Sequence, residues 1–154
     1  MMNKIDQFIV FKLGREEFGV KITQVQEIIK MKEITKLPQS ADFIEGIINL
    51  RGDIITIIDL RKRLEFNYDP EVETRIIVVR INETDVGFIV DDASEVVRIA
   101  QEQIAQPSGG MAGIKTEFID GIAKLEDRLV ILLALDELLS TTEKAKLEEV
   151  VENN

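Results

Sequence analysis

The 154-residue chain contains no cysteine, no histidine and no tryptophan, and only three prolines. Without cysteine it has no disulfide and no thiolate nucleophile, and without histidine it lacks the commonest metal ligand and the usual general base near neutral pH. It can neither carry a phosphohistidine nor assemble a Ser–His or Cys–His pair. The sequence therefore predicts a protein without catalytic turnover, small-molecule substrate, bound metal, nucleotide or cofactor.

Long hydrophobic runs are also missing. No stretch reaches the roughly 18 apolar residues of a membrane-spanning helix, and Met1–Ile9 carries Lys4 and Asp6 in place of a signal-peptide core. The formal net charge of −10 repels nucleic-acid phosphates and anionic lipids. We therefore expect a cytoplasmic protein that neither inserts into membranes nor binds nucleic acid.

Hydrophobic residues make up 45% of the chain and charged residues 31%, as in soluble globular domains. Short Ile- and Val-rich runs bounded by polar or Gly-containing turns predict a mainly β barrel or sandwich. The expected strands are Phe8–Leu13, Gly19–Ile22, Gly46–Leu50, Ile54–Ile58, Ile76–Ile81, Val86–Val90 and Leu129–Leu135. Helical periodicity is limited to Gln24–Lys30, Leu60–Leu64 and an acidic C-terminal segment, where Ser140 and Glu143 form a capping box.

The sequence aligns with itself in two blocks. Residues 7–31 align without gaps on 75–99, and residues 43–64 align on 118–139. Because the blocks keep their order and spacing, we predict two homologous halves, about 7–70 and 71–140, with the helix or tail at 141–154. Each half has the length of one small barrel, and we expect each half to form its own barrel. The alternative explanation of the self-alignment is generic strand patterning.

Residues 43–64 predict a β-hairpin whose turn contains Arg51, Gly52 and Asp53, with Gly52 supplying a positive φ. At this turn the two halves differ most, since Lys124, Glu126, Asp127 and Arg128 replace Asn49, Arg51, Gly52 and Asp53 in the second half. Arg51 near Asn49 could donate to a partner's carboxylate or carbonyl groups. An ordinary solvated turn with a local Arg51–Asp53 pair explains the residues equally well.

Two further features invite a chemical interpretation. Gln101–Glu117 contains Pro107-Ser108-Gly109-Gly110 but lacks the lysine and the strand-to-helix context of a phosphate-binding loop, so we expect an exposed loop.

Asp91 and Asp92 raise the possibility of a phosphoacceptor site with a divalent cation. Such receiver domains alternate strands with long helices, which are scarce here, so the pair is interpreted as a turn after a strand.

Residues 46–61 read GIINLRGDIITIIDLR and resemble the signature of the CheW family, G-hydrophobic-x-N-L-R-G-x-hydrophobic-hydrophobic-P-hydrophobic-hydrophobic-D-L-R. The resemblance extends over roughly residues 5–140, through Phe11–Gly14, Phe18–Val20, Val25–Ile28, Leu37-Pro38, Gly87–Asp91 and Ile119–Gly121. Thr56 departs from it, because the family usually has proline there.

The resemblance implies two tandem five-stranded SH3-like barrels with short helices. It also implies a non-catalytic coupling protein, recruited to membrane-associated arrays, that links the cytoplasmic tip of methyl-accepting chemoreceptors to the regulatory domain of the histidine kinase CheA. Carried over by residue, it implies receptor contacts near the groove between the barrels, made by Val25, Glu27, Ile28, Asn49, Arg51 and Gly52.

For the kinase contact the resemblance points to barrel edges and ends. The candidates are Gly46, Arg75 and Val96, and an ordinary packing or strand-end role is an equal alternative for each. The same domain also occurs within the kinase and in scaffold–receiver fusions. Met1 lies only a few residues before the first expected strand, and an acidic tail follows Ser140. Both features favour a stand-alone chain over a fragment of a larger protein.

Overall fold

The computed structural model describes residues 4–37, 44–64, 73–81, 83–106 and 116–138. The expected helix after Ser140 and most of the glycine-containing loop lie outside these ranges. The described elements are β1 (Ile5–Leu13), β2 (Glu16–Lys21), η1 (Ile22–Gln24), β3 (Val25–Lys30), β4 (Ile44–Leu50), β5 (Asp53–Asp59), α1 (Leu60–Arg63), β6 (Thr74–Ile81), β7 (Thr84–Ala100), η2 (Gln101–Gln103), β8 (Ile104–Ala105), η3 (Thr116–Phe118), β9 (Ile119–Leu125), β10 (Arg128–Leu133) and η4 (Leu135–Glu137).

The fold is mainly β, as the sequence predicts, with helices only one turn long in the described ranges. Every expected strand overlaps an observed one, because each Ile- and Val-rich run fits a pleated, half-buried surface. The predicted helix at Leu60–Leu64 is also present: Asp59 precedes it, and the Asp59 side chain accepts a hydrogen bond from the Arg61 backbone, as an N-cap does. Leu60 and Leu64 of this turn are buried in the core.

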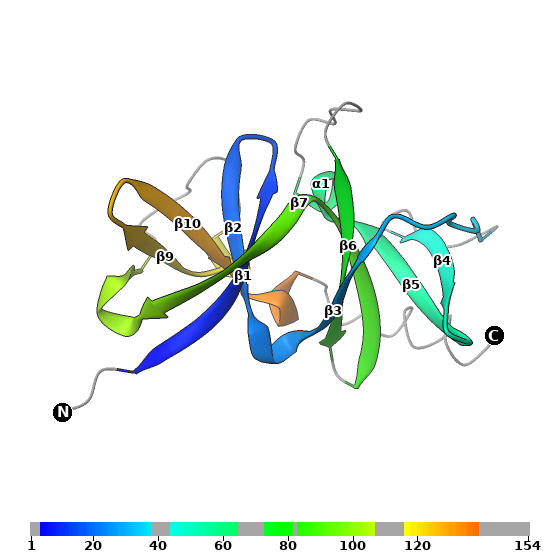
Figure 1. The fold of residues 1–154 in the computed structure, drawn as a ribbon, viewed down its shortest axis with the longest axis horizontal. Helices are drawn as coiled ribbons and strands as arrows, with labels where there is room; N and C mark the ends of the chain where they lie inside the picture. Colours follow the sequence, from blue (N-terminus) through cyan, green and yellow to red (C-terminus); the bar gives the residue numbers. More distant parts are fainter. Residues whose placement is uncertain (1–3, 38–43, 65–72, 82, 107–115, 139–154) are drawn as a thin grey trace.

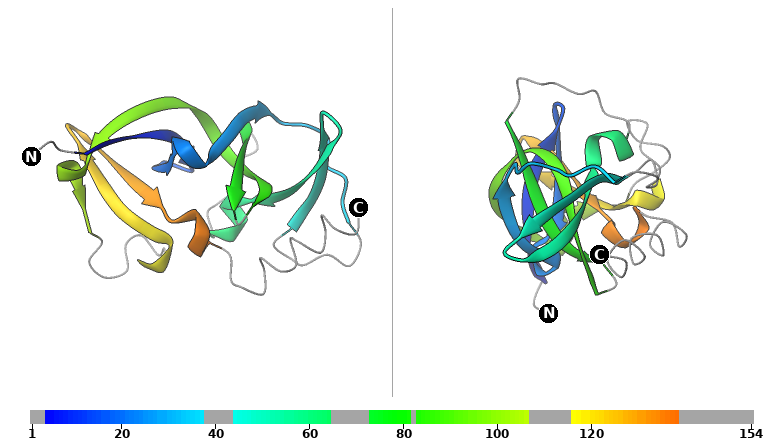
Figure 2. Two further views of the ribbon diagram at one scale, coloured as in Figure 1. Left: turned by 90° about the horizontal axis from the view of Figure 1, so that it is seen from below. Right: turned by 90° about the vertical axis from the view of Figure 1, so that its right-hand side faces the viewer.

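The sheet curls into two barrel-like units that lie side by side along the long axis of the molecule (Figures 1 and 2). Unit A contains β3, β4, β5, β6 and the first half of β7. Unit B contains β1, β2, β8, β9, β10 and the second half of β7. Strand β7 therefore belongs to both, pairing with β6 up to Asp91 and with β1 from there to Ala100.

Equivalent strands of the two sequence halves pair in the same register. Val10 lies opposite Gly19 in β1–β2, as Val78 lies opposite Gly87 in β6–β7. The β4–β5 and β9–β10 hairpins repeat in the same way: Gly46 is opposite Ile57, and Gly121 is opposite Leu132. These are the pairs that the self-alignment matches.

The two halves nevertheless exchange strands, so the prediction that each half forms its own barrel is wrong. Unit A joins β3–β5 of the first half to β6 and early β7 of the second half, and unit B joins β1–β2 to late β7 and β8–β10. A cut near residue 70 would divide both units. The exchange keeps the pairing rules of the repeat, because β3 pairs with β6 and, equivalently, late β7 pairs with β1.

The core has three parts. One cluster fills unit A and includes Ile48, Ile57 and Ile76; its counterpart in unit B includes Phe8 and Leu132. The largest cluster draws on both units and is called here the inter-unit core. Its size shows that burial between the units, as well as within them, stabilises the fold.

Candidate functional site

The β4–β5 turn presents Arg51 to solvent. Arg51 and Gly52 both have positive φ, 53° and 92°, the combination that a two-residue turn between twisted strands requires. The Asn49 side chain accepts a hydrogen bond from the Gly52 backbone N–H at 2.8 Å and so closes the turn. The Arg51 side chain remains 69% exposed. Asn49 and Gly52 therefore fix the shape of the turn. Arg51 is the group of the turn that can reach a partner.

Arg51 forms a two-pronged ion pair with Glu27 of β3, 24 residues earlier in the chain. Its Nη1 donates to Glu27 Oε1 at 3.1 Å, and its Nη2 donates to Oε2. The hydrogen bonds and charge of Arg51 lower the pKa of Glu27. The pair joins the β3 candidates to the turn candidates, as a shared site requires, and such an exposed pair adds little to stability.

The segment Gln24–Lys30 is not a helix: Ile22–Gln24 form one 3₁₀ turn and Val25–Lys30 form strand β3. The helical prediction failed because an irregularity in the β3–β6 pairing lies between Val25 and Glu27. The extra residue brings Val25 and Ile28 to the same face, so their spacing of three imitates helical periodicity. Both pack against the inter-unit core, whereas Glu27 lies on the opposite face of the strand.

The three candidate kinase contacts do not gather. Gly46 is buried in β4, with a φ of 154°, and a Cβ there would lie 2.3 Å from the Thr35 carbonyl oxygen. The glycine thus allows the close hydrogen-bonded approach of Thr35 to Ile47, which supports the packing interpretation. Arg75 lies in β6 and donates to Glu73 Oε1 at 2.8 Å, and Val96 is a 52% exposed residue of β7.

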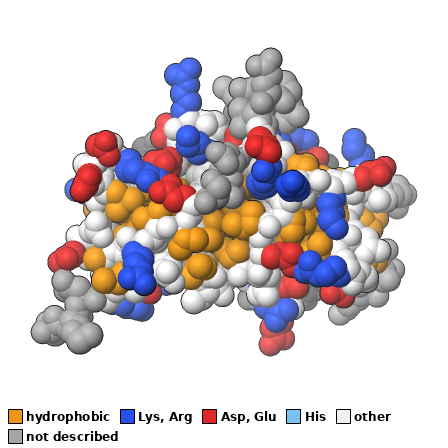
Figure 3. All heavy atoms as spheres, viewed as in Figure 1, with side chains coloured by type: hydrophobic (Ala, Val, Ile, Leu, Met, Phe, Trp, Pro, Cys, Tyr) orange, Lys and Arg blue, Asp and Glu red, His pale blue; other side chains and the backbone are white. Residues whose placement is uncertain are grey.

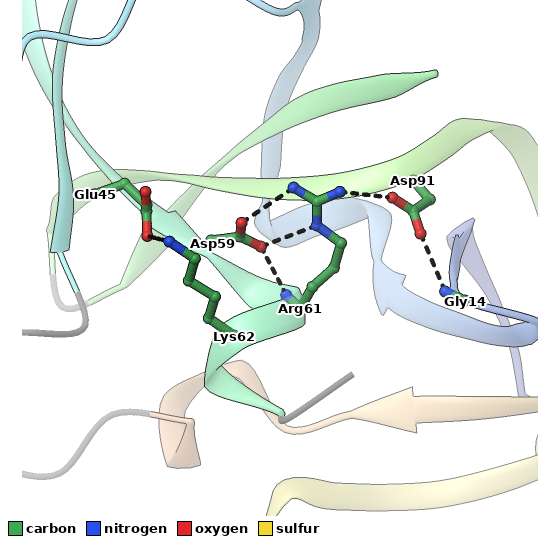
Figure 4. Close-up of polar contacts among 6 residues, drawn as sticks. All are labelled: Gly14, Glu45, Asp59, Arg61, Lys62 and Asp91. Carbon is green, nitrogen blue, oxygen red and sulfur yellow. Dashed lines mark hydrogen bonds and ion pairs between the residues drawn. The ribbon is translucent and has the colours of Figure 1, made fainter. Parts of the chain in front are cut away.

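The structure contains a buried polar cluster that the sequence did not predict, and two of its residues, Asp59 and Arg61, end the signature (Figure 4). The Arg61 Nη2 and Nε atoms donate to the two oxygens of Asp59 at 3.0 and 3.1 Å, and Nη1 donates to Asp91 Oδ1 at 3.3 Å. The second oxygen of Asp91 accepts the Gly14 backbone N–H at 3.0 Å. The sequence signal for this cluster is the pair Asp59 and Arg61, two charged residues directly after an apolar run. Charged residues that are buried need partners of opposite charge.

This cluster ties the units together. Asp59 and Arg61 come from the end of β5 and from α1 in unit A, Asp91 sits where β7 passes between units, and Gly14 belongs to the β1–β2 turn of unit B. The side chains of Arg61 and Asp91 are only 5% and 2% exposed. The interpretation of Asp91 as a turn residue is wrong: it lies within a continuous strand, and both of its oxygens are engaged by Arg61 and Gly14.

The arrangement offers no basis for a metal centre or a membrane span in the ranges that the structure describes. Within them, no group of three or more acidic residues could hold a metal ion. None of the helices that they contain has the length and hydrophobicity needed to cross a bilayer.

Comparison with known proteins gives one consistent answer. The family model of the CheW-like domain matches residues 7–143. The chain is 36% identical to the chemotaxis protein CheW of Klebsiella aerogenes, covering 96% of this chain and 90% of that protein. For the Bacillus subtilis CheW the values are 35%, 87% and 86%. The crystal structure of the scaffolding protein TtCheW from Thermoanaerobacter tengcongensis superposes with a TM-score of 0.81 at 39% identity, covering 91% of both chains. The chain therefore belongs to the CheW-like domain family.

Proposed function

We propose that this protein is a chemotaxis coupling scaffold that links methyl-accepting chemoreceptors to the histidine kinase CheA and places the kinase under receptor control. Membership of the CheW-like family supports the scaffold role. The single structural observation that carries the proposal is the Glu27–Arg51 pair, which brings the two groups of candidate receptor contacts to one place. The turn leaves the Arg51 side chain of this pair 69% exposed, so a partner can reach it.

The proposed receptor site consists of two parts. Glu27 and Arg51 form its polar part, with Asn49 and Gly52 fixing the turn that carries Arg51. Val25 and Ile28, partly buried against the inter-unit core, form the apolar part on the other face of β3. A receptor surface that contacts both parts has to meet the edge of unit A at β3, which pairs only with β6 among the named strands.

The proposed function involves no catalysis. Asp91, one of the two candidate phosphoacceptors, has both oxygens engaged and a nearly inaccessible side chain. A scaffold needs only two interfaces, each of which can be individually weak if many copies act together in an array. We place the protein in the cytoplasm, recruited to membrane-associated receptors, with no small-molecule substrate and no nucleic-acid partner.

The decisive experiment measures binding to two partners separately and together. One is a cytoplasmic chemoreceptor fragment that includes the tip, and the other is the isolated regulatory domain of CheA. We expect binding to each and a ternary complex when all three are mixed, because coupling requires both surfaces to be occupied at once. If the partners compete, or if either fails to bind, the proposal is wrong.

A further inference from the structure

Unit B contains a cavity of about 420 Å³ at one end of its barrel-like sheet. Three apolar side chains, Phe8, Ile104 and Leu132, form its floor. Phe8 and Leu132 are buried in the core cluster of unit B, and Ile104 packs against that cluster. The cavity, called here the unit B mouth, is therefore the place where the interior of unit B opens to solvent. Small-molecule sites have volumes in this range and occur preferentially in the mouths of β-barrels.

Charged side chains of both signs line the same cavity, and they are Lys4, Asp6, Lys21 and Asp120. Lys21 lies opposite Phe8, and Asp6 lies opposite Ile99, another residue of the unit B core. Opposite residues of an antiparallel pair point to the same side of the sheet, so Asp6 and Lys21 continue the core side of β1 and β2 out to the rim. Asp120 lies at an irregularity in the β9–β10 pairing, a bulge of the kind that re-aims a side chain.

The four charges of the mouth do not neutralise one another by direct contact. None of their side chains forms an ion pair or a hydrogen bond within the described part of the chain. At the opposite end of unit B the charges do pair, since Arg128 donates to Glu17 and Glu95 at 2.7–3.1 Å. On the side of unit B seen at the left of Figure 3, side chains of both charges border hydrophobic ones. The unit therefore does not offer a single sign of charge to a ligand.

The other half of the sequence shows that a barrel of this kind does not need these charges. The self-alignment matches Lys21 with Ile89 and, extended by one residue, Asp6 with Thr74. Ile89 is buried in the core cluster of unit A. An uncharged residue at either position is thus compatible with the strand pairing, so the charges at the unit B mouth call for a reason other than folding.

Asp120 differs from its counterpart in its pairing. In unit A the matching residue, Glu45, accepts a hydrogen bond from Lys62 Nζ at 2.6 Å. The residue that matches Lys62 in the second half is Glu137, an acid in place of the cation. Asp120 and Glu137 both line a smaller cavity of about 230 Å³, which shares Asp120 and Lys21 with the mouth. Asp120 therefore lacks the cation that its counterpart has, and the cationic group of a ligand can take that place.

We infer that the unit B mouth binds a small zwitterion with an apolar side chain, of the size of a dipeptide. Its ammonium group contacts Asp6 and Asp120, its carboxylate contacts Lys4 and Lys21, and its side chain covers the apolar floor. Charge complementarity selects the zwitterion, because a ligand of one charge would meet two side chains of the same sign. The molecule is bound as a ligand, with no bond made or broken. The site lies in unit B and goes beyond the proposed scaffold function, whose receptor site is in unit A.

The probe is the dipeptide leucylglycine, titrated into the unmodified full-length protein by calorimetry and by NMR. We expect a Kd of about 0.1–1 mM, with chemical-shift changes concentrated on the residues of the mouth. N-acetyl-leucylglycine lacks the ammonium charge, and leucylglycinamide lacks the carboxylate. Each analogue should bind about tenfold more weakly, because each loses one pair of charge-assisted hydrogen bonds.

Two variants carry the residues of the other half into the mouth. Lys21→Ile and Asp6→Thr each introduce the residue that the matching strand of the other half already holds, so the fold should be kept. Lys124→Ile and Asp127→Thr make the same changes at exposed positions of the β9–β10 hairpin, at the other end of unit B. Thermal unfolding checks all four proteins. We expect the two mouth variants to bind leucylglycine about tenfold more weakly and the two controls to stay within about twofold.

The inference is overturned if leucylglycine does not bind at a concentration of about 10 mM. It is also overturned if the two uncharged-end analogues bind as tightly as the dipeptide, or if the mouth variants bind it like the controls. These titrations contain no receptor and no kinase, so their failure leaves the proposed function standing, and a failure of receptor or kinase binding leaves the ligand site standing.

Discussion

Units A and B each hold a glutamate–arginine pair in which the glutamates are at equivalent positions, but the arginines are not, and the two pairs are built differently. The self-alignment matches Glu27 with Glu95. In unit A, Glu27 pairs with Arg51 at the β4–β5 turn, and the Arg51 side chain is 69% exposed. In unit B, Glu95 shares Arg128 with Glu17, and the Arg128 side chain is 30% exposed and makes four hydrogen bonds. The B pair links three strands, whereas the A pair is accessible to a partner.

The ends of the two hairpins differ in the same sense. After β5, Asp59 and Arg61 enter the buried cluster with Asp91. The matching residues after β10 are Ala134 and the exposed Asp136. The two halves therefore share their strand pairing and differ in their polar residues. Unit A holds the exposed Glu27–Arg51 pair and the buried cluster that connects the units, and unit B holds an ion pair that links three of its strands.

The largest difference is expected from removing the buried arginine. Arg61→Ala leaves two carboxylates without their cation in a buried place, which should cost about 3–5 kcal/mol of unfolding free energy. The equivalent change in the other copy, Asp136→Ala, removes an exposed charge and should stay within about 0.5 kcal/mol. Urea unfolding of both variants measures the two values. Equal stability of the variants would show that the cluster does not hold the units together.

A second asymmetry concerns the equivalent glycines. A Cβ on Gly46 would meet the Thr35 carbonyl oxygen at 2.3 Å, and the φ of 154° is one that side chains disfavour. On Gly121 the nearest atom, at 2.5 Å, is the γ2 methyl of Ile104, a side-chain atom, and the nearest backbone atom is 3.3 Å away. We expect Gly46→Ala to cost about 3 kcal/mol and Gly121→Ala about 1 kcal/mol. Chemical unfolding gives the order, and the reverse order would contradict the explanation.

Thr56 breaks the repeat inside the core. Its side chain is fully buried, and its hydroxyl has no hydrogen-bond partner among the residues that the structure describes, whereas the other copy has Ile131 at this position. Thr56→Val should therefore stabilise the protein by about 1 kcal/mol, since an unpaired buried hydroxyl is removed. Ile131→Thr should have the opposite effect, roughly 1–3 kcal/mol. A Thr56→Val variant that is less stable than the unmodified protein would mean that the hydroxyl has a partner after all.

The smallest effect is a dependence on pH in unit B. Hydrogen bonds and charge from Arg128 lower the pKa of Glu95 below its ordinary value. A carboxyl whose pKa is lower in the folded state stabilises the fold above its ordinary pKa, and this contribution is lost as pH falls through the lowered pKa. Glu95→Gln should thus reduce the thermal midpoint at neutral pH and have no effect in strong acid.

Glu126→Gln serves as the control for that measurement, because it removes one negative charge from an exposed turn residue of the same unit. A difference between the two variants that persists unchanged into strong acid would contradict the ion-pair explanation.

The strands and their equivalence could be predicted from the sequence, but the exchange between halves could not. Alternating apolar residues locate β1, β4, β5 and β6, and the self-alignment reproduces their registers. It does not say whether β1 pairs with late β7 or with its own β3. The two choices bring equivalent residues together and bury equivalent surfaces, so local pattern cannot separate them.

The candidate site was predictable in part. The signature identified the turn, and Gly52 indicated its positive φ, but the partner of Arg51 lies 24 residues away and depends on long-range pairing. The bulge in β3 imitated a helix, so the strand that positions Glu27 was not expected. The buried role of Arg61 could not be predicted, because its partner Asp91 lies on a strand whose crossing between the units follows from topology alone.

The measurement that tests the account most directly is receptor binding by Arg51→Glu beside Lys124→Glu, two equal charge changes at matching hairpins of the two units. Since Arg51 is exposed, the thermal midpoints of both variants should lie within about 2 °C of the unmodified protein. Arg51→Glu should bind the chemoreceptor tip fragment at least about tenfold more weakly and the kinase regulatory domain normally, with Lys124→Glu unchanged for both. Equal receptor binding by the two variants would contradict the assignment of the receptor site to unit A.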